Sequence, residues 1–159
     1  MVDPRIEQAL SEAEDAHARL VDSLVGVDDS WCRAPSLLPG WSRGHVLTHV
    51  ARNADALERL ATGTAEGRTV AMYGPGAARE ADIEAGAGRS AAKLVDDVRT
   101  SAERLHGTCR ALPAQTWDAV PEWRNGRRQP LTDIAPARVV EAEVHRVDLG
   151  AGYTPNEWA

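Results

Sequence analysis

Hydrophobic side chains recur along this chain at intervals of three and four residues, in four separate stretches. That spacing places the apolar positions on one face of an α-helix, because successive helical residues are rotated by about 100°. Residues that commonly end helices follow three of the stretches, at Gly26, Gly63 and Pro113. The pattern therefore predicts an all-α protein with four long amphipathic helices, at residues 4–25, 42–62, 90–112 and 132–149.

Two connections between these helices are long. Residues 63–76 form a turn-rich segment that predicts a long loop, followed by a short helix near residues 77–85. Long loops in compact domains are often functional. The segment 113–130 contains the turn signal Asn125-Gly126 and predicts a partly extended excursion, with a small hairpin as one form of it. Three apolar side chains of this excursion are expected to cap the bundle: Trp117, Val120 and Trp123.

The composition favours one globular domain over residues 1–159. Hydrophobic residues make up 43% and charged residues 26% of the chain, which is ordinary for a folded protein. The length of 159 residues suits one core rather than two domains of usual size. Cys32 and Cys109 are too few for a disulfide framework and lack the CxxC spacing of a cysteine metal site, so both are expected to be reduced and structural.

Charge and hydropathy exclude two classes of partner. A formal net charge of −6 leaves no basic surface to neutralise a phosphate backbone, so we expect no nucleic-acid partner. No apolar run reaches the roughly 18 residues that a membrane span needs, and the acidic start MVDPRIEQ lacks the features of a signal peptide. We therefore expect a cytoplasmic protein with no membrane contact, and the sequence leaves open whether it forms a homo-oligomer.

The last predicted helix carries polar residues where its core-facing stripe should be. Glu141, Val144, His145 and Asp148 lie side by side at helical spacing. Burying a carboxylate or an imidazole without a partner costs several kcal/mol, so these polar positions need a shared explanation. Glu141 and His145 are four residues apart, the spacing that lets two side chains of one helix grip the same ion.

A divalent metal ion supplies that explanation. His49 lies at the centre of the apolar face of the second helix and can complete a triad with Glu141 and His145. Two imidazoles and one carboxylate suit zinc, and three protein ligands leave a coordination position open for water or substrate. The E-x-x-x-H spacing alone also fits the alternative of a hydrogen-bonded polar core.

The remaining histidines and acidic residues have simpler interpretations. His45 lies four residues before His49 and is a rival ligand, although its place in the first helical turn favours a partly exposed capping role. His17 is expected to be a hydrogen-bonded core histidine and His106 to be solvated. Glu143 should face solvent or a neighbouring helix. Asp148 is a candidate to accept an N–H from an imidazole ligand, with a salt bridge to an arginine as the alternative.

Three motifs taken together resemble one protein family. The segments LPGWSRGHVLTHVARN (38–53), MYGPGAAREADIEAGAGR (72–89) and RVVEAEVHRVDLG (138–150) resemble those of the mycothiol-dependent maleylpyruvate isomerases, in the family's order. The resemblance covers essentially the whole chain and is to their N-terminal metal-binding domain, a DinB-like four-helix bundle. It implies that a divalent ion, typically zinc, is held by His49, Glu141 and His145, and that His45 is not a ligand.

The resemblance also implies further features of the site. Arg79, in the loop motif, would contact carboxylates of the substrate or of the thiol cofactor, with a structural ion pair as the alternative. Members of the family carry a second, C-terminal domain that helps to close the active site and contributes a basic residue to it. This sequence ends at Ala159, as a natural one-domain relative or a fragment would, so the isomerase substrate stays open.

We therefore expect a metal-dependent enzyme that uses the low-molecular-weight thiol mycothiol as cosubstrate. The thiol would bind the metal's open position as a thiolate and add to an electrophilic substrate, either for cis–trans isomerisation, as with maleylpyruvate, or for S-transfer. Arg79 and Asp148 are the candidate catalytic residues beside the metal ligands. Two alternatives stay open: a zinc hydrolase in which Asp148 or His45 assists bound water, and a non-catalytic metal-binding bundle that acts as a sensor or interaction module.

Overall fold

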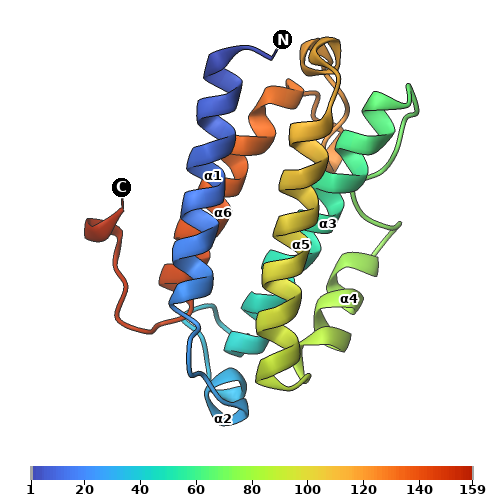
Figure 1. Cartoon of the computed structure of the whole chain (residues 1–159). Helices are drawn as coiled ribbons and strands as arrows, with labels where there is room; N and C mark the ends of the chain where they lie inside the picture. The colour runs from blue at the N-terminus through green and yellow to red at the C-terminus, as the bar shows by residue number, and fades with distance from the viewer. Residues whose placement is uncertain (1, 159) are drawn as a thin grey trace.

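Helices account for all the regular secondary structure in the part of the chain that the structure describes, residues 2–158 (Figure 1). The protein is represented here by a computed structural model. Its four long helices are α1 (Pro4–Asp22), α3 (Arg43–Ala65), α5 (Ala91–Ala111) and α6 (Ile134–Asp148). The shorter helices are α2 (Asp29–Arg33) and α4 (Ala78–Ala87). Short 3₁₀ turns lie at Ala114–Asp118, Arg124–Gly126, Leu131–Asp133 and Pro155–Glu157.

The four long helices form the predicted bundle. Helix α1 packs beside α6 and helix α3 beside α5, while α3 also contacts α6. Figure 1 shows that α1 and α6 run in one direction, and that α3 and α5 run in the other. Helix α4 packs against α3, on the outer side of the bundle in this view. The expected all-α, four-helix architecture is confirmed.

Local sequence determines where the helices begin. Asp3 precedes Pro4 and its carboxylate accepts the backbone N–H of Arg5 at 2.8 Å, as an N-cap does. Ser42 caps α3: its hydroxyl accepts the backbone N–H of His45 at 3.4 Å, while the His45 ring accepts the backbone N–H of Ser42 at 3.1 Å. This reciprocal capping box satisfies two backbone donors that the first helical turn leaves unpaired.

Gly63 was expected to end the second long helix, and that expectation is wrong. Helix α3 continues through Gly63 to Ala65. A Cβ atom at residue 63 would lie 2.6 Å from the Val70 side chain, so the missing side chain permits the following loop to pack closely on the helix. The glycine is therefore used for close approach rather than for termination.

Two connections contain short elements. The connection between α1 and α3 holds the short helix α2, which Asp28 caps by accepting the backbone N–H of Trp31 at 2.8 Å. The excursion 113–130 holds 3₁₀ turns and one isolated antiparallel bridge, Glu122 to Arg128, instead of a hairpin with strands. Within it Trp117 is buried as predicted, whereas Val120 is 42% exposed and does not cap the bundle.

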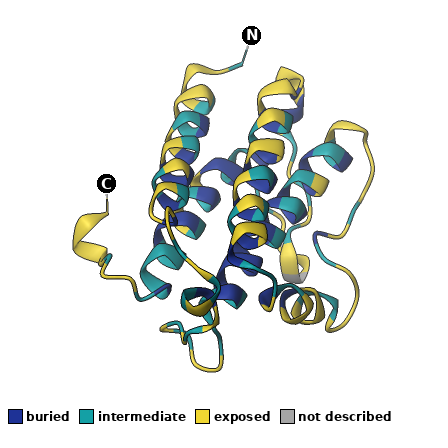
Figure 2. Ribbon diagram, turned by 60° about the horizontal axis from the view of Figure 1, so that its bottom comes forward, coloured by how far each residue is buried: buried dark blue, intermediate teal, exposed yellow. Residues whose placement is uncertain are grey.

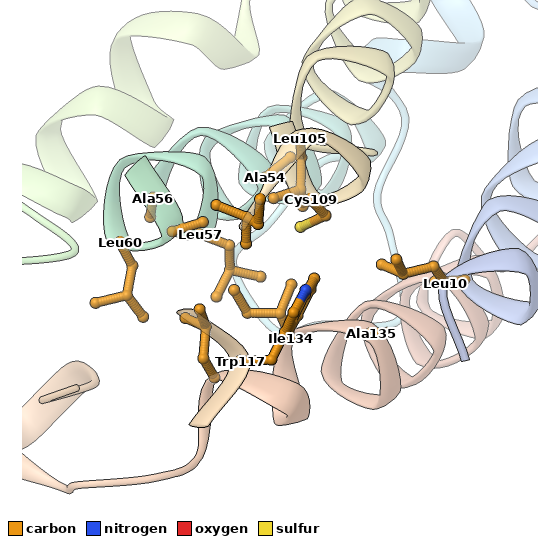
Figure 3. Packing of buried hydrophobic residues seen from close by; sticks show 14 of the residues in the cluster. Leu10, Ala54, Ala56, Leu57, Leu60, Leu105, Cys109, Trp117, Ile134 and Ala135 are labelled. Carbon is orange, nitrogen blue, oxygen red and sulfur yellow. The ribbon is translucent and has the colours of Figure 1, made fainter. Parts of the chain in front are cut away.

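The buried apolar side chains form two clusters, one toward each end of the bundle. One cluster gathers the N-terminal half of α1, the C-terminal halves of α3 and α5 and the start of α6. Figure 3 shows part of it, with Leu57, Leu105 and Ile134 converging from three helices. The other cluster contains the opposite halves of these helices together with α2. Cys109 belongs to the first cluster and Cys32 to the second, and both are free thiols.

A buried polar layer separates the two clusters. It consists of His17 on α1, Asn53 on α3, Ser101 on α5 and Arg138 on α6. Each of these residues lies, along its own helix, between members of the first and of the second cluster. Figure 2 shows the buried faces of the long helices turned toward one another, with the exposed positions on the outside. The core of the bundle is therefore interrupted by hydrogen-bonding groups at mid-height.

The core-facing stripe of the last helix differs from the predicted one. The fully buried positions of α6 include Ala135, Arg138 and Ala142, whereas Glu141, Val144, His145 and Asp148 are only partly buried. The predicted stripe therefore lies at the border of the core, where side chains still reach a partly open surface. Among residues 2–158, no helix combines the length and the apolar character that crossing a membrane would require.

The contact between α3 and α4 leads to a test of the fold. A Cβ atom at Gly44 would lie 2.2 Å from the carbonyl oxygen of Ala87, a backbone atom that cannot rotate away. Gly44→Ala should therefore displace α4 and lower the free energy of unfolding by roughly 1–3 kcal/mol. The matched variant Gly107→Ala adds a methyl group at an exposed position of α5 with no atom within 4 Å, and should raise it by up to about 1 kcal/mol. Urea unfolding measures both, and equal effects would contradict the close approach.

Candidate metal centre

Three side chains from two helices converge between α3 and α6. His49 and His145 each place Nε2 3.2 Å from Oε2 of Glu141. The two imidazole rings are perpendicular, with centroids 4.6 Å apart. One ligand atom of each residue lies within 4.8 Å of the others, and within residues 2–158 this is the single group of three or more such side chains placed to hold a metal ion.

Helix geometry brings these three groups together. His49 is buried near the first quarter of α3, on the face that meets α6. Glu141 and His145 are one turn apart on α6, so their side chains point to the same side of that helix. The packing of α3 against α6 then closes the distance between positions that are about ninety residues apart in the chain.

Each imidazole has a partner on its second nitrogen. The Nδ1–H of His145 donates to Oδ2 of Asp148 at 2.8 Å, which leaves Nε2 as the ligand atom. Asp148 thus contacts an imidazole, which is the first of the two interpretations that the sequence left open for it. Arg79, the second residue of α4, donates from Nη2 to Nδ1 of His49 at 3.0 Å and from Nη1 to Glu80 at 3.1 Å.

Burial and charge shift the protonation of the three groups. Burial would raise the pKa of Glu141, but the adjacent His145 and His49 outweigh it and lower that pKa below its usual range. Burial also lowers the pKa of His49, more than Glu141 raises it. For His145 burial acts in the same direction, yet Glu141 and Asp148 together raise its pKa above the ordinary value of 6.5.

The donor set fits a divalent metal ion. Oε2 of Glu141 is buried, and no hydrogen bond in the described part of the chain satisfies it although two imidazole nitrogens lie at 3.2 Å. A buried carboxylate oxygen without a hydrogen bond is costly. Two imidazoles and one carboxylate that converge on one point form a ligand set typical of zinc, with a coordination position left for a further ligand.

His45, the rival ligand, is directed elsewhere. Its Nδ1 accepts the backbone N–H of Ser42, and its Nε2 lies 3.0 Å from the Glu84 carboxylate on α4. His45 therefore serves as the N3 residue of the α3 capping box and is occupied at both nitrogens. The ring of Trp41 lies against both His45 and His49, at centroid distances of 6.1 and 5.8 Å.

The sequence also singled out His17, His106 and Glu143, and the structure shows the surroundings of each. His17 is buried, and its Nε2–H donates to the carbonyl of Val98 at 3.0 Å, as expected of a core histidine. His106 was expected to be solvated and is not, because its side chain is only 13% exposed and its ring packs edge-on against His17. Glu143 faces the neighbouring helix α1, where it pairs with Arg19 at 2.8 Å.

Sequence reasoning missed a cavity beside this centre. A space of about 350 Å³ lies between residues 69–80 and residues 122–126. Tyr73, Arg79, Trp123 and Arg124 are among its lining residues, and Arg79 reaches from it to His49. The Arg79 guanidinium also lies 5.6 Å from the centroid of the Tyr73 ring. The two segments are irregular, so periodicity carries no signal for their meeting; loop length was the single sequence cue.

Sequence reasoning also missed Arg138, a fully buried residue of α6. Its Nη1 donates to Oδ1 of Asn53 at 2.7 Å, and its Nη2 donates to Nδ1 of His17 at 3.4 Å. A signal was present: Arg138 falls at helical spacing with Ala135, Ala142 and His145, on the core side of the helix. An arginine at such a position is rare without a partner, and the sequence alone does not name the partner.

Comparison with known proteins gives concordant results. The family model described as the mycothiol maleylpyruvate isomerase N-terminal domain matches residues 10–150. The crystal structure of the mycothiol-dependent maleylpyruvate isomerase superposes with a TM-score of 0.92 at 30% identity, and covers 97% of this chain and 64% of that chain. The structure of a histidine-to-alanine mutant of the isomerase gives a TM-score of 0.91 at 29% identity, with the same coverage. None of the curated proteins matches the chain.

The chain thus spans 64% of the length of the solved isomerase that it resembles. The family match covers most of the sequence, including all three metal-ligand candidates. The structural match extends over the whole helical fold and confirms the resemblance that the three sequence motifs indicated. The chain belongs to the family of mycothiol maleylpyruvate isomerase N-terminal domains.

Proposed function

We propose that this protein binds a divalent metal ion, zinc, through His49, Glu141 and His145, and uses it to activate mycothiol for attack on an electrophilic substrate. The observation that carries the proposal is the convergence of two imidazoles and one carboxylate, within 4.8 Å of one another, around a buried oxygen that lacks a hydrogen bond. When bound, the ion would supply deprotonation of a coordinated thiol at neutral pH. Family membership supports the choice of mycothiol as the thiol.

Asp148 contributes by orienting His145. Its hydrogen bond to Nδ1–H fixes the tautomer in which Nε2 carries the lone pair. The carboxylate is engaged in this contact, and His45 is engaged with Ser42 and Glu84. A hydrolase would need one of these two groups as a general base, so the geometry favours the thiol-dependent function over hydrolysis.

Arg79 contributes by reaching both His49 and the adjacent cavity. In its present position it donates to Nδ1 of His49, which requires a lone pair on that nitrogen and hence a proton on Nε2. If Nε2 of His49 binds the metal, the ring proton must lie on Nδ1 instead. The Nδ1–H of His49 would then face an N–H of Arg79. The Arg79 side chain would therefore leave His49 for the cavity, where a guanidinium can pair with a carboxylate of the substrate or thiol.

In the isomerase form of the proposal, the thiolate adds to the double bond of maleylpyruvate, the new single bond rotates, and elimination of the thiol leaves fumarylpyruvate. In the transferase form, the thiol adduct is released after it takes up a proton. Both forms need a substrate site that communicates with the metal ligands, and the cavity lined by Tyr73, Arg79 and Trp123 is linked to them through the contact of Arg79 with His49.

Cobalt substitution tests the thiol-dependent function directly. Mycothiol added to the cobalt-loaded protein should produce an intense sulfur-to-cobalt charge-transfer band, because a thiolate occupies the open coordination position. S-methylated mycothiol serves as the control and should give no such band. Cobalt binding without any band, together with thiol-independent cleavage of an amide or a thiol conjugate, would support a hydrolase instead.

The ligand assignment is tested by a pair of histidine variants on α3. His49→Ala should weaken cobalt binding by about 100-fold or more, beyond the effect usual for a residue that only supports a ligand. His45→Ala should leave cobalt affinity within about tenfold of the wild type, because it removes the capping contact, the contact with Glu84 and the packing on Trp41 but no metal ligand. Isothermal titration calorimetry gives both affinities. A larger loss for His45→Ala than for His49→Ala would overturn the assignment.

Metal uptake should also depend on pH through His145. The raised pKa of His145 keeps its imidazole protonated to a higher pH, and the proton competes with the metal for the ring. The apparent association constant for cobalt should therefore rise with pH and reach half of its limiting value above pH 6.5. Asp148→Asn removes one cause of the raised pKa and should shift this midpoint to lower pH, while lowering the limiting affinity about 10–100-fold. An unchanged midpoint would show that Asp148 does not control this proton.

A further inference from the structure

Arg138 occupies an unusual electrostatic position. The residue is only 1% exposed, and its hydrogen-bond acceptors are all uncharged: Asn53 Oδ1, the Val50 carbonyl and His17 Nδ1. Its Nε has no hydrogen-bond partner, and within residues 2–158 no carboxylate forms an ion pair with it. Arginine stays protonated even when buried, so a full positive charge lies in the bundle core without direct neutralisation. A buried charge without a partner lowers the stability of the folded protein, which points to a second role for Arg138.

The groups around Arg138 indicate which residue its charge acts on. Glu141 on the same helix contributes most to holding the guanidinium charged against burial, ahead of Tyr73 and Asp55. His17 accepts a hydrogen bond from Arg138 and is neutral, since burial and this guanidinium lower its pKa to about 3. His106 on α5 is likewise held toward its neutral form by burial and by Arg138. Glu141 also lies three residues after Arg138 on α6, a spacing that places two side chains next to each other on one face of a helix, so the compensating charge comes from a predicted metal ligand.

The position of Arg138 repeats the geometry of the metal centre one helical turn away. Asn53 follows His49 by four residues on α3, and Arg138 precedes Glu141 by three residues on α6. Because the two helices run in opposite directions, the 2.7 Å bond between Arg138 and Asn53 lies beside the contact between Glu141 and His49 on the same interface. A shift of α6 along α3 would break both.

We propose that Arg138 is a positioning residue of the metal centre, with two effects. Its hydrogen bond to Asn53 sets the register of α6 against α3, and so brings Glu141 and His145 to His49. Its charge offsets part of the negative charge of Glu141, so a bound metal ion retains more of its own charge and makes a coordinated thiol more acidic. The second effect rests on the thiol-dependent function proposed above, while the first requires only metal binding.

The first test replaces Arg138 by residues that separate charge from shape. Arg138→Met removes the uncompensated buried charge but leaves Asn53 Oδ1 and His17 Nδ1 without their donor, so these two effects oppose each other and the melting temperature should fall by no more than a few degrees. The variant should nevertheless bind cobalt at least about tenfold more weakly and raise the pH at which the cobalt–mycothiol band is half formed by about one unit. Arg138→Lys should restore that pH while recovering only part of the affinity. Arg146→Met, on the same helix outside the α3 interface, is the matched control and should change neither.

A second variant keeps the proposal testable if Arg138→Met does not fold. Asn53→Asp is isosteric and gives the guanidinium a carboxylate partner, so it should raise the melting temperature of the metal-free protein. Because the new carboxylate neutralises Arg138, Asn53→Asp should still raise the pH at which the cobalt–mycothiol band is half formed. A purely structural role would instead give unchanged band positions in both variants, and unchanged cobalt affinity in Arg138→Met and Arg138→Lys would overturn the register effect. If the wild type forms no thiol band, the proposed function fails, while the cobalt affinities still decide the role of Arg138 in metal binding.

Discussion

The interface between α3 and α6 is the constraint on which the rest of the molecule depends, because it buries polar groups that must be paired. A purely apolar interface would tolerate small shifts of one helix along the other, since apolar contacts are not directional. Here the guanidinium of Arg138 must meet Asn53, and the carboxylate of Glu141 must lie between two imidazoles. Each requirement is satisfied at one relative position of the helices, so the polar layer selects a register that the two apolar clusters alone would leave loosely defined.

The surroundings of this interface give the two histidines different roles. His145 is fixed from its own helix by Asp148, so its orientation is independent of the rest of the bundle. His49 is contacted by Arg79, which belongs to a separate helix that a close approach at Gly44 holds against α3. In the proposed metal centre, His145 would therefore be the fixed ligand, whereas the neighbour of His49, Arg79, also lines the cavity. The proposed function would then couple substrate position to ligand chemistry through one arginine.

The sequence predicted the helices and the ligand candidates for the same reason: both depend on periodicity within single helices. Spacing placed Glu141 and His145 together, and the position of His49 on the apolar face of its helix made it the candidate to join them. Gly63 was misjudged because glycine serves both as a helix stop and as a point of close packing, which only the neighbour Val70 distinguishes. Arg138 and the cavity depend on contacts between distant segments, which no local pattern encodes. The one-domain organisation over residues 1–159 and the metal-ligand roles stay predictions.

The burial of both cysteines matters if the centre handles thiols and electrophiles as proposed. Burial raises the pKa of Cys109 to about 12 and raises that of Cys32 as well, so neither forms an appreciable amount of thiolate at neutral pH. Each sulfur is also enclosed by apolar side chains at opposite ends of the bundle. A reagent that alkylates or oxidises accessible sulfur would consequently find the small-molecule thiol and spare the polypeptide, which makes the scaffold resistant to the chemistry it is proposed to promote.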